Sequence, residues 1–257
     1  GVARGGAGRL AARAALRAGA GLVTLAVPPA ALIENAARLD AVMLRPLDGP
    51  AALSAMLEDP RLSAICLGPG LGAGEGPGAR TRGLVAAALE TGRPAILDAD
   101  ALTAHADEPW ELFAALHPRA VLTPHEGEFA RLFPDLAPDP GAGRSAVEAA
   151  RAAAARAGAV VLLKGPATVI AAPDGRAAIH AAVYQTAAPW LATAGTGDVL
   201  SGLIAGLCAR PGLEDPWERA GLAVWLHAAC ARAFGPGLIA EDLPDRIPEV
   251  LRARGVG

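Results

Sequence analysis

The segment from residue 191 to residue 206 joins a turn of small residues to an apolar stretch with helical composition, and its one carboxylate, Asp198, lies at the junction. Residues 194–197, Ala-Gly-Thr-Gly, are small enough for their backbone N–H groups to approach a ligand closely. The first N–H groups of a helix have no partner within the helix, and the helix dipole places partial positive charge there. Such a turn binds phosphate and stabilises the charge that develops on a transferring phosphoryl group.

Asp198 follows this turn directly, where a carboxylate could take a proton from a substrate hydroxyl. An aspartate at the start of a helix is also an ordinary N-cap, which is the structural alternative. Two features favour function: glycines flank Thr196, and the expected helix keeps small residues at Gly202, Ala205 and Gly206. We therefore predict that Asp198 is a general base beside an anion-binding turn.

Polar or glycine-rich segments also follow apolar runs elsewhere in the chain. They are Gly68-Pro69-Gly70-Leu71-Gly72, Asp98 with Asp100, His125 with Glu126 and Glu128, and Lys164-Gly165. Ligands of parallel α/β sheets bind beyond the carboxyl ends of the strands, so these segments are candidates for one common site.

Each of these candidates also has an ordinary structural role. Residues 68–72 fit a tight turn, because they match neither the dinucleotide-binding glycine fingerprint nor a P-loop. His125 could cap or pack against a helix for which Glu126 and Glu128 supply first-turn carboxylates. Lys164 could extend its apolar stem over the protein to reach solvent, or it could contact a phosphate. We expect the remaining histidines to be structural: His105, His117, His180 and His227.

Strand and helix patterns alternate along the chain, which predicts an α/β fold with a mostly parallel sheet covered by helices. Strands are expected at 22–27, 41–44, 64–67, 95–98, 120–123 and 160–165, with a hairpin of 168–172 and 176–179 around Pro173-Asp174-Gly175. Helices are expected at 7–19, 30–38, 51–57, 80–90, 145–157, after Asp198, and at 220–232.

The composition of the 257 residues, 53% hydrophobic but only 4% aromatic, predicts a core of Leu, Val, Ile and Ala. The formal net charge of -3, with scattered Lys and Arg, gives no indication of a nucleic-acid surface.

Three widely spaced cysteines in apolar contexts predict neither a disulfide nor a metal site and favour a reducing compartment. No apolar run is long enough for a membrane span and no signal peptide is visible, so we expect a soluble cytoplasmic protein.

We expect one domain over residues 1–257, because no internal repeat or long linker divides the chain. The chain opens at Gly1 in what looks like a loop before a helix. A first strand with its own glycine turn could therefore precede it.

These segments together resemble the ribokinase-like superfamily and, within it, the NAD(P)H-hydrate dehydratase family, or YjeF-type carbohydrate-kinase-like domain. The motifs that carry the resemblance are Gly6-Ala7-Gly8-Arg9-Leu10 with residues 17–23, residues 68–72, 97–102, 123–128, Lys164-Gly165, residues 191–206, and residues 240–243 with Ile247-Pro248. Each motif is weak alone, but their order and spacing are specific. The resemblance implies a three-layer αβα sandwich with a mostly parallel central sheet.

The family repairs NADH and NADPH whose nicotinamide ring has added water. The resemblance implies phosphorylation of the ring hydroxyl of the S-form hydrate and elimination of phosphate, with Mg²⁺ as cofactor. Bacterial members typically use ADP and eukaryotic ones ATP, and the composition here favours a bacterial chain, hence ADP. A homo-oligomer fused to, or acting with, an NAD(P)H-hydrate epimerase is also implied.

Carried onto this sequence, the family's substrate contacts fall on Ala7, Gly70, Gly72, His125 and Asp198, and Asp198 is also the general base. The adenine nucleotide contacts fall on two segments, Lys164-Gly165-Pro166-Ala167-Thr168 and Ala194-Gly195-Thr196-Gly197, of which the second forms the anion hole. No protein ligand for a metal is implied.

The chain departs from the family where Ala187-Ala188-Pro189 replaces the usual Gly-Asn-Pro. A polar contact near the phosphates is then absent or supplied by another residue. Two alternatives stay open. One is a ribokinase-like kinase of a small alcohol such as hydroxymethylpyrimidine or hydroxyethylthiazole, which would share Asp198 but not the 123–128 motif in this form. The other is a nucleotide-binding module without catalysis.

Overall fold

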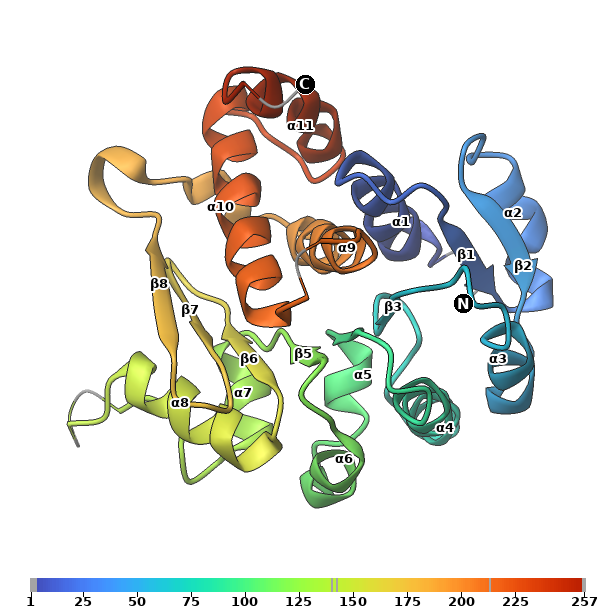
Figure 1. Cartoon of the computed structure of the whole chain (residues 1–257), viewed down its shortest axis with the longest axis horizontal. Coiled ribbons are helices and arrows are strands. Elements are labelled where there is room, and N and C mark those ends of the chain that lie inside the picture. Colours follow the sequence, from blue (N-terminus) through green and yellow to red (C-terminus); the bar gives the residue numbers. More distant parts are fainter. Residues whose placement is uncertain (1–3, 140, 142, 213, 256–257) are drawn as a thin grey trace.

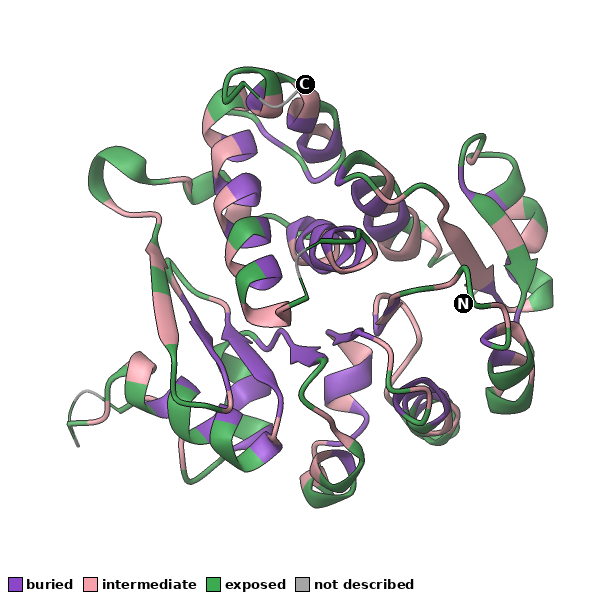
Figure 2. Ribbon diagram, in the orientation of Figure 1, coloured by how far each residue is buried: buried purple, intermediate pink, exposed green. Residues whose placement is uncertain are grey.

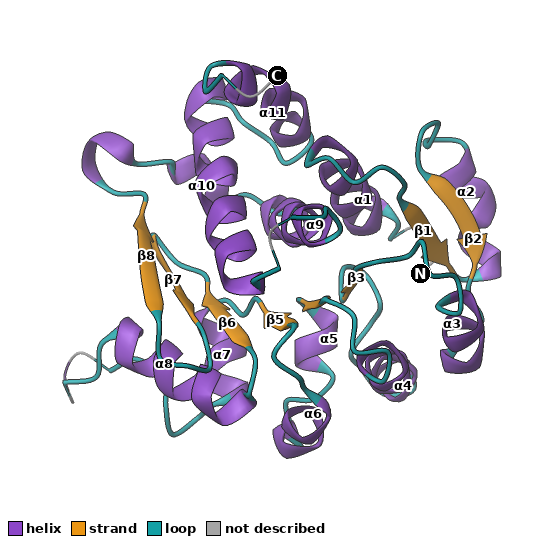
Figure 3. Ribbon diagram, viewed as in Figure 1, coloured by secondary structure: helices purple, strands orange, loops and turns teal. Residues whose placement is uncertain are grey.

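The computed structural model describes residues 4–139, 141, 143–212 and 214–255, so Gly1 lies outside the described residues. Helices cover both faces of a central sheet (Figures 1 and 3). One face carries α1 (Gly6–Arg17), α9 (Thr196–Cys208), α10 (Pro216–Phe234) and α11 (Asp242–Arg252). The other face carries α3 (Pro50–Met56), α4 (Pro77–Leu89), α5 (Asp100–Thr103), α6 (Pro109–Ala115), α7 (Glu126–Leu132) and α8 (Ala146–Ala157), while α2 (Leu32–Ala36) lies beside the smaller sheet.

The larger sheet has the order β3 (Ile65–Leu67), β4 (Ala95–Leu97), β5 (Ala120–Leu122), β6 (Val160–Leu163), β7 (Ala167–Ala171) and β8 (Ala177–Ala181). Its strands β3 to β6 are parallel, and the β7–β8 hairpin continues it in antiparallel pairing. Strands β1 (Thr24–Val27) and β2 (Met43–Pro46) form a separate parallel pair. The predicted mostly parallel αβα sandwich and the predicted hairpin are confirmed.

The core divides into two clusters because successive strand residues point to opposite faces of the sheet. Leu97 of β4 and Leu122 of β5 pack toward α4 and α8. Their neighbours Ile96 and Val121 pack toward α9 and α10. The strands are therefore apolar on both faces and lie in the purple interior of Figure 2, which is the pattern of a parallel sheet covered on both sides.

Helices α1 and α9 pack unusually closely, and glycines make this possible. A Cβ built on Gly202 would lie 2.1 Å from the backbone O of Ala11, and one on Gly206 would lie 2.5 Å from the O of Ala15. The small residues along α9 therefore serve helix packing, and their use above as a sign of a ligand site is wrong. The packing still fixes the start of α9 against α1.

Three described helices, α5, α6 and α11, are absent from the sequence expectations above. Helix α11 contains Pro248 and a polar first turn, which weakens its helical pattern. Tertiary contacts stabilise it instead: Leu243 and Ile247 are buried against the α9–α10 layer, and Asp245 pairs with Arg13 of α1. Within the described part of the chain, no helix is long and apolar enough to cross a membrane.

Candidate active site

The turn at residues 194–197 leads into α9. Three features fix its geometry: the backbone conformation of Gly195, the side-chain hydrogen bonds of Thr196, and a contact from His227. Gly195 is the N-cap and has φ = 90°, a left-handed conformation that favours glycine. Oγ1 of Thr196 lies 2.7 Å from the O of Leu191 and 2.9 Å from the O of Thr193. From α10, Nε2 of the buried His227 lies 2.9 Å from the O of Thr196. The first N–H groups of α9 are thus held in place without a side-chain cap.

Asp198 is the third residue of α9 and does not cap it, so the capping alternative is wrong. Among the described residues its carboxylate makes no hydrogen bond or ion pair. Burial raises the pKa of Asp198 to about 6, and the nearby Asp98 carboxylate adds to the rise while Lys164 opposes it. A carboxyl group with this pKa is mostly ionised at neutral pH, yet it is more basic than an ordinary aspartate and is suited to accept a proton.

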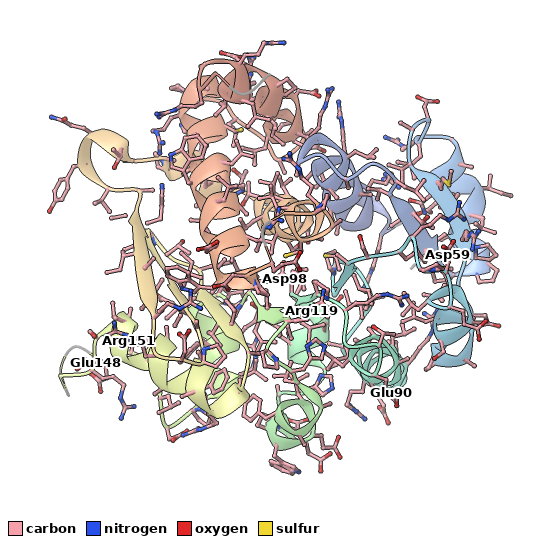
Figure 4. All side chains as sticks on the ribbon, in the orientation of Figure 1. Asp59, Glu90, Asp98, Arg119, Glu148 and Arg151 are labelled. Carbon is pink, nitrogen blue, oxygen red and sulfur yellow. The ribbon has the colours of Figure 1, made fainter. Side chains whose placement is uncertain are left out.

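Asp98 and Lys164 form a buried ion pair beside the turn. Nζ of Lys164 lies 2.7 Å from Oδ1 of Asp98 and 3.9 Å from Oε2 of Glu128. Figure 4 shows Asp98 near the centre of the molecule, at the end of β4. A Cβ built on Gly197 would lie 3.5 Å from that Nζ, which places the ammonium directly at the turn.

The 68–72 turn follows β3 and meets the same cluster. The backbone N–H of Gly72 donates to Oδ2 of Asp100 at 2.8 Å, and the Asp100 charge also acts on Asp198. A Cβ built on Gly70 would lie 3.9 Å from the Cβ of Ala7, at the start of α1. The structure therefore brings Ala7, Gly70 and Gly72 together, and Asp100 links them to Asp198.

His125 is the N-cap of α7, as the structural alternative above allowed. Its Nδ1 accepts the backbone N–H groups of Gly127 and Glu128, while the Glu128 carboxylate accepts the N–H of His125 at 2.9 Å. The ring is 54% exposed, and its Nε2 lies 3.5 Å from Oε1 of the buried Glu128 carboxylate, so the exposed part of the ring remains open to a ligand. Capping and ligand binding are therefore compatible at this histidine.

The segment 164–168 is only partly at the centre of the site. The backbone N–H of Lys164 donates to the O of Pro124, and a parallel bridge joins Lys164 to His125. The remaining four residues run along the exposed start of the hairpin, where Oγ1 of Thr168 donates to the O of Gly165 at 3.0 Å. Lys164 thus contacts the charged cluster, whereas Pro166, Ala167 and Thr168 lie at its margin.

Three acidic residues of the cluster, Asp98, Asp100 and Glu128, were among the strand-end candidates for a common site, but the sequence assigned none of them a contact or a role. The structure brings Asp98 and Glu128 to Lys164, and Asp100 to the 68–72 turn. Lys164 also has a different immediate partner from the expected phosphate, namely Asp98.

The sequence profile of the family described as NAD(P)H-hydrate dehydratase matches residues 2–251. The chain belongs to this family. It is 41% identical over 263 aligned residues to a "Bifunctional NAD(P)H-hydrate repair enzyme Nnr" of Salinibacter ruber, which covers 97% of this chain and 46% of the relative. A Moorella thermoacetica protein of the same name is 42% identical, over 96% of this chain and 47% of the relative. The chain thus spans about half the length of these relatives.

Solved structures agree with this family assignment. An ADP/ATP-dependent NAD(P)H-hydrate dehydratase from Bacillus subtilis, co-crystallised with ATP and Mg²⁺, matches with a TM-score of 0.76 and 31% identity, covering 98% of this chain and 86% of that one. A ribokinase-like superfamily protein from Enterococcus faecalis has a TM-score of 0.77 at 22% identity, covering 99% of this chain and 85% of that one, and supports the fold. Membership of a repair-dehydratase family favours that activity over a small-alcohol kinase.

Proposed function

We propose that this protein dehydrates the S-form hydrates of NADH and NADPH, with ADP as phosphoryl donor. The observation that carries the proposal is the unpaired Asp198 carboxylate, with a pKa of about 6, directly after the 194–197 turn at the start of α9. The N–H of Thr196 donates to the O of Thr193, whereas the N–H groups of Gly197 and Asp198 have no backbone acceptor among the described residues. A base and free N–H groups at one point are the two elements that phosphoryl transfer to a hydroxyl requires.

In the proposed reaction Asp198 takes the proton from the ring hydroxyl, and the hydroxyl oxygen bonds to the β-phosphorus of ADP as the bond to the AMP oxygen breaks. The first N–H groups of α9 stabilise the charge that develops on the transferring phosphoryl oxygens. The phosphorylated ring then loses phosphate by cleavage of its C–O bond while the neighbouring ring carbon loses a proton, and the double bond that forms between these two carbons restores the reduced nicotinamide. The products are NADH or NADPH, AMP and phosphate.

Mg²⁺ fits this site as a companion of the nucleotide. Within the described residues, no three His, Cys, Asp or Glu side chains are grouped so as to hold a metal, and Mg²⁺ bound mainly through phosphates and water needs no such group. When bound, the ion would neutralise phosphate charge. The protein's own contributions are the 194–197 turn and the Lys164 ammonium, which lies beside Gly197.

The remaining expected contacts support two separate parts of the site, one for the hydrated dinucleotide and one for the adenine nucleotide. We place the hydrated dinucleotide along Ala7, Gly70 and Gly72, on the side of the cluster where Asp100 contacts Gly72, and across to the half-exposed ring of His125 beside Lys164. The adenine nucleotide would extend from the 194–197 turn past Lys164 toward the exposed 165–168 segment, which is open to a ligand. Alanine at 187 and 188 leaves the phosphate contacts of this chain to backbone N–H groups and Lys164.

The donor is tested by steady-state kinetics. Hydrated NADH is incubated with Mg²⁺ and either ADP or ATP, and the regenerated dihydronicotinamide is followed by its absorbance. With ADP the β-phosphorus must reach the turn, so the adenosine lies one phosphate closer than with ATP, and kcat/KM should be higher for ADP. A clearly higher kcat/KM for ATP would refute the donor while leaving the repair reaction standing. No turnover with either donor would refute the function and favour a non-catalytic module.

We also propose a cytoplasmic homo-oligomer that acts with an NAD(P)H-hydrate epimerase, since the relatives are bifunctional proteins about twice as long. An apolar cavity lies between β1 and β3, lined by residues that include Leu25, Leu57 and Leu67.

A further inference from the structure

The ion pair between Asp98 and Lys164 is more deeply buried than stability alone requires. The side chain of Asp98 is 2% exposed and that of Lys164 is 20% exposed, at an N–O distance of 2.7 Å. Removing two charges from water costs several kcal/mol each, and a well-packed apolar pair is often as stable. A buried pair in a sheet that is otherwise apolar on both faces therefore calls for a reason other than folding.

The location of the pair supplies that reason. A Cβ built on Gly197 would lie 3.5 Å from the Nζ of Lys164 and 4.0 Å from Oδ2 of Asp98, so both charged groups face the first turn of α9. Lys164 follows β6 and Asp98 follows β4, with β5 between them in the sheet. The long lysine side chain crosses the end of β5 to reach Asp98, and Glu128 lies 3.9 Å from the same ammonium.

We propose that Asp98 is a positioning residue: its carboxylate holds the Lys164 ammonium at Gly197, where the ammonium faces the transferring phosphoryl group, and the two charges together set the electrostatic field at Asp198. The inference rests on the proposed function. It assigns to Asp98 no contact with substrate, and it makes Lys164 the group through which Asp98 acts.

The field at Asp198 comes from groups on every element packed around the start of α9. They are Cys66 on β3, Asp98 after β4, Asp100 on α5, Lys164 after β6, and His227 on α10, while Arg13 and Arg17 of α1 pair with Asp245 of α11. Burial keeps the Cys66 thiol and the His227 ring neutral near pH 7, because it raises the pKa of Cys66 to about 12 and lowers that of His227 to about 4. The charges that remain next to Asp198 are therefore Asp98, Asp100 and Lys164.

Opposite effects of the two partners follow from their charges. Asp98→Asn removes a negative charge, so Asp198 should lose its proton at lower pH than in the parent. Lys164→Gln removes a positive charge, so Asp198 should retain its proton to higher pH. The double variant removes one charge of each sign and should return the titration toward the parent value. These shifts test the electrostatic part of the proposal, and the kinetic measurement below tests the positioning of Lys164.

The test is a ¹³C NMR titration of the Asp198 side-chain carboxyl in the full chain, with its signal assigned by Asp198→Asn. Asp135→Asn is the matched control, because Asp135 forms an Arg156 ion pair of the same 2.7 Å length that is exposed and outside the site. The expected midpoints are lower in Asp98→Asn, higher in Lys164→Gln, and unchanged in Asp135→Asn. Equal midpoints in the parent, Asp98→Asn and Lys164→Gln would overturn the proposal, and circular dichroism verifies that each variant is folded.

A kinetic measurement separates this inference from the proposed function. In Asp98→Asn, kcat with hydrated NADH and ADP should fall roughly 10- to 100-fold, because a displaced catalytic group costs rate, while KM for ADP changes little. The acid limb of its pH profile should move to lower pH, together with the NMR midpoint. A parent without turnover would refute the proposed function, yet the NMR titration would still decide whether the pair sets the field at Asp198. An active parent whose kcat and pH profile are unaffected by Asp98→Asn would refute the positioning role alone.

Discussion

Replacing Asp198 with Asn is expected to remove most of the activity and, at the same time, to raise the stability of the fold at neutral pH. Burial and the Asp98 carboxylate raise the pKa of Asp198 to about 6, from 3.8 for an ordinary aspartate. The folded protein therefore binds this proton more tightly than the unfolded chain does. Once the pH rises through the folded-state pKa, the ionised carboxylate lowers the free energy of unfolding.

The size of the effect follows from the pKa shift. A rise from 3.8 to about 6 at 1.36 kcal/mol per unit corresponds to ~3 kcal/mol. Because the side chain is partly exposed, solvent screening reduces this to about 1–2 kcal/mol. In a domain of this size that corresponds to a rise of about 2–8 °C in the Tm of Asp198→Asn above pH 7. The gain should shrink as the pH falls and vanish below about pH 4, where Asp198 is protonated in both states.

Thermal unfolding at several pH values between 4 and 8, with parallel turnover assays, tests both halves of this prediction. Turnover should fall by about two to four orders of magnitude, the range for loss of a general base, while ADP binding is largely kept. Asp135→Asn is the control of opposite sign, because Arg156 holds the pKa of Asp135 at about 2, so its neutralisation should not raise Tm at neutral pH. A Tm for Asp198→Asn at or below the parent value at pH 8 would refute the electrostatic reasoning, and near-normal turnover would refute the role as base.

Three further predictions follow from the same geometry. In the parent, kcat/KM should fall about tenfold per pH unit below pH 6, since the base is then protonated; a flat profile down to pH 5 would exclude Asp198. Gly197→Val should abolish ADP binding in calorimetry while the protein stays folded, because its methyl groups enter the space beside Lys164, and unchanged affinity would place the phosphate site elsewhere. Gly202→Ala should lower the stability by about 1–3 kcal/mol or more, because the added Cβ meets the backbone O of Ala11 at 2.1 Å; a Tm equal to the parent's would contradict the close packing of α1 on α9.

Local sequence patterns predicted most of the architecture. Apolar strand runs between amphipathic or alanine-rich helices require a covered parallel sheet, and Pro173-Asp174-Gly175 predicted the hairpin because its turn chemistry is local. The turn before Asp198 was likewise predictable, since small residues before a helix leave N–H groups open whatever the rest of the fold does. Helix α11 was not predictable in this way, because its stability comes from contacts with α1 and α10 and not from its own residues.

Tertiary structure alone decided why glycine is needed at positions 195, 202 and 206. Gly195 is required by a left-handed backbone at the helix start, whereas Gly202 and Gly206 are required by the approach of α1. In the sequence all three belong to one glycine-rich helix start, and no local signal separates a glycine that faces a ligand from one that faces another helix. Helix α1 and helix α9 lie some 190 residues apart in the chain and cross with their backbones in close contact. Only this crossing shows which glycines of the segment face another helix.

For the charged cluster too, the sequence determined where each residue lies along the chain, and tertiary structure decided which residues meet. The sequence by itself determined that Asp98, Glu128 and Lys164 lie at or just after the ends of strands, because the apolar runs end there. It did not determine that Lys164 reaches Asp98 across β5, since that depends on the strand order β4-β5-β6 and on the length of one side chain. Strand order is set by the packing of helices on both faces of the sheet, a property of the whole chain. A local motif therefore indicated the candidate base, Asp198, whereas the burial and the neighbouring charges that raise its pKa were decided only by the fold.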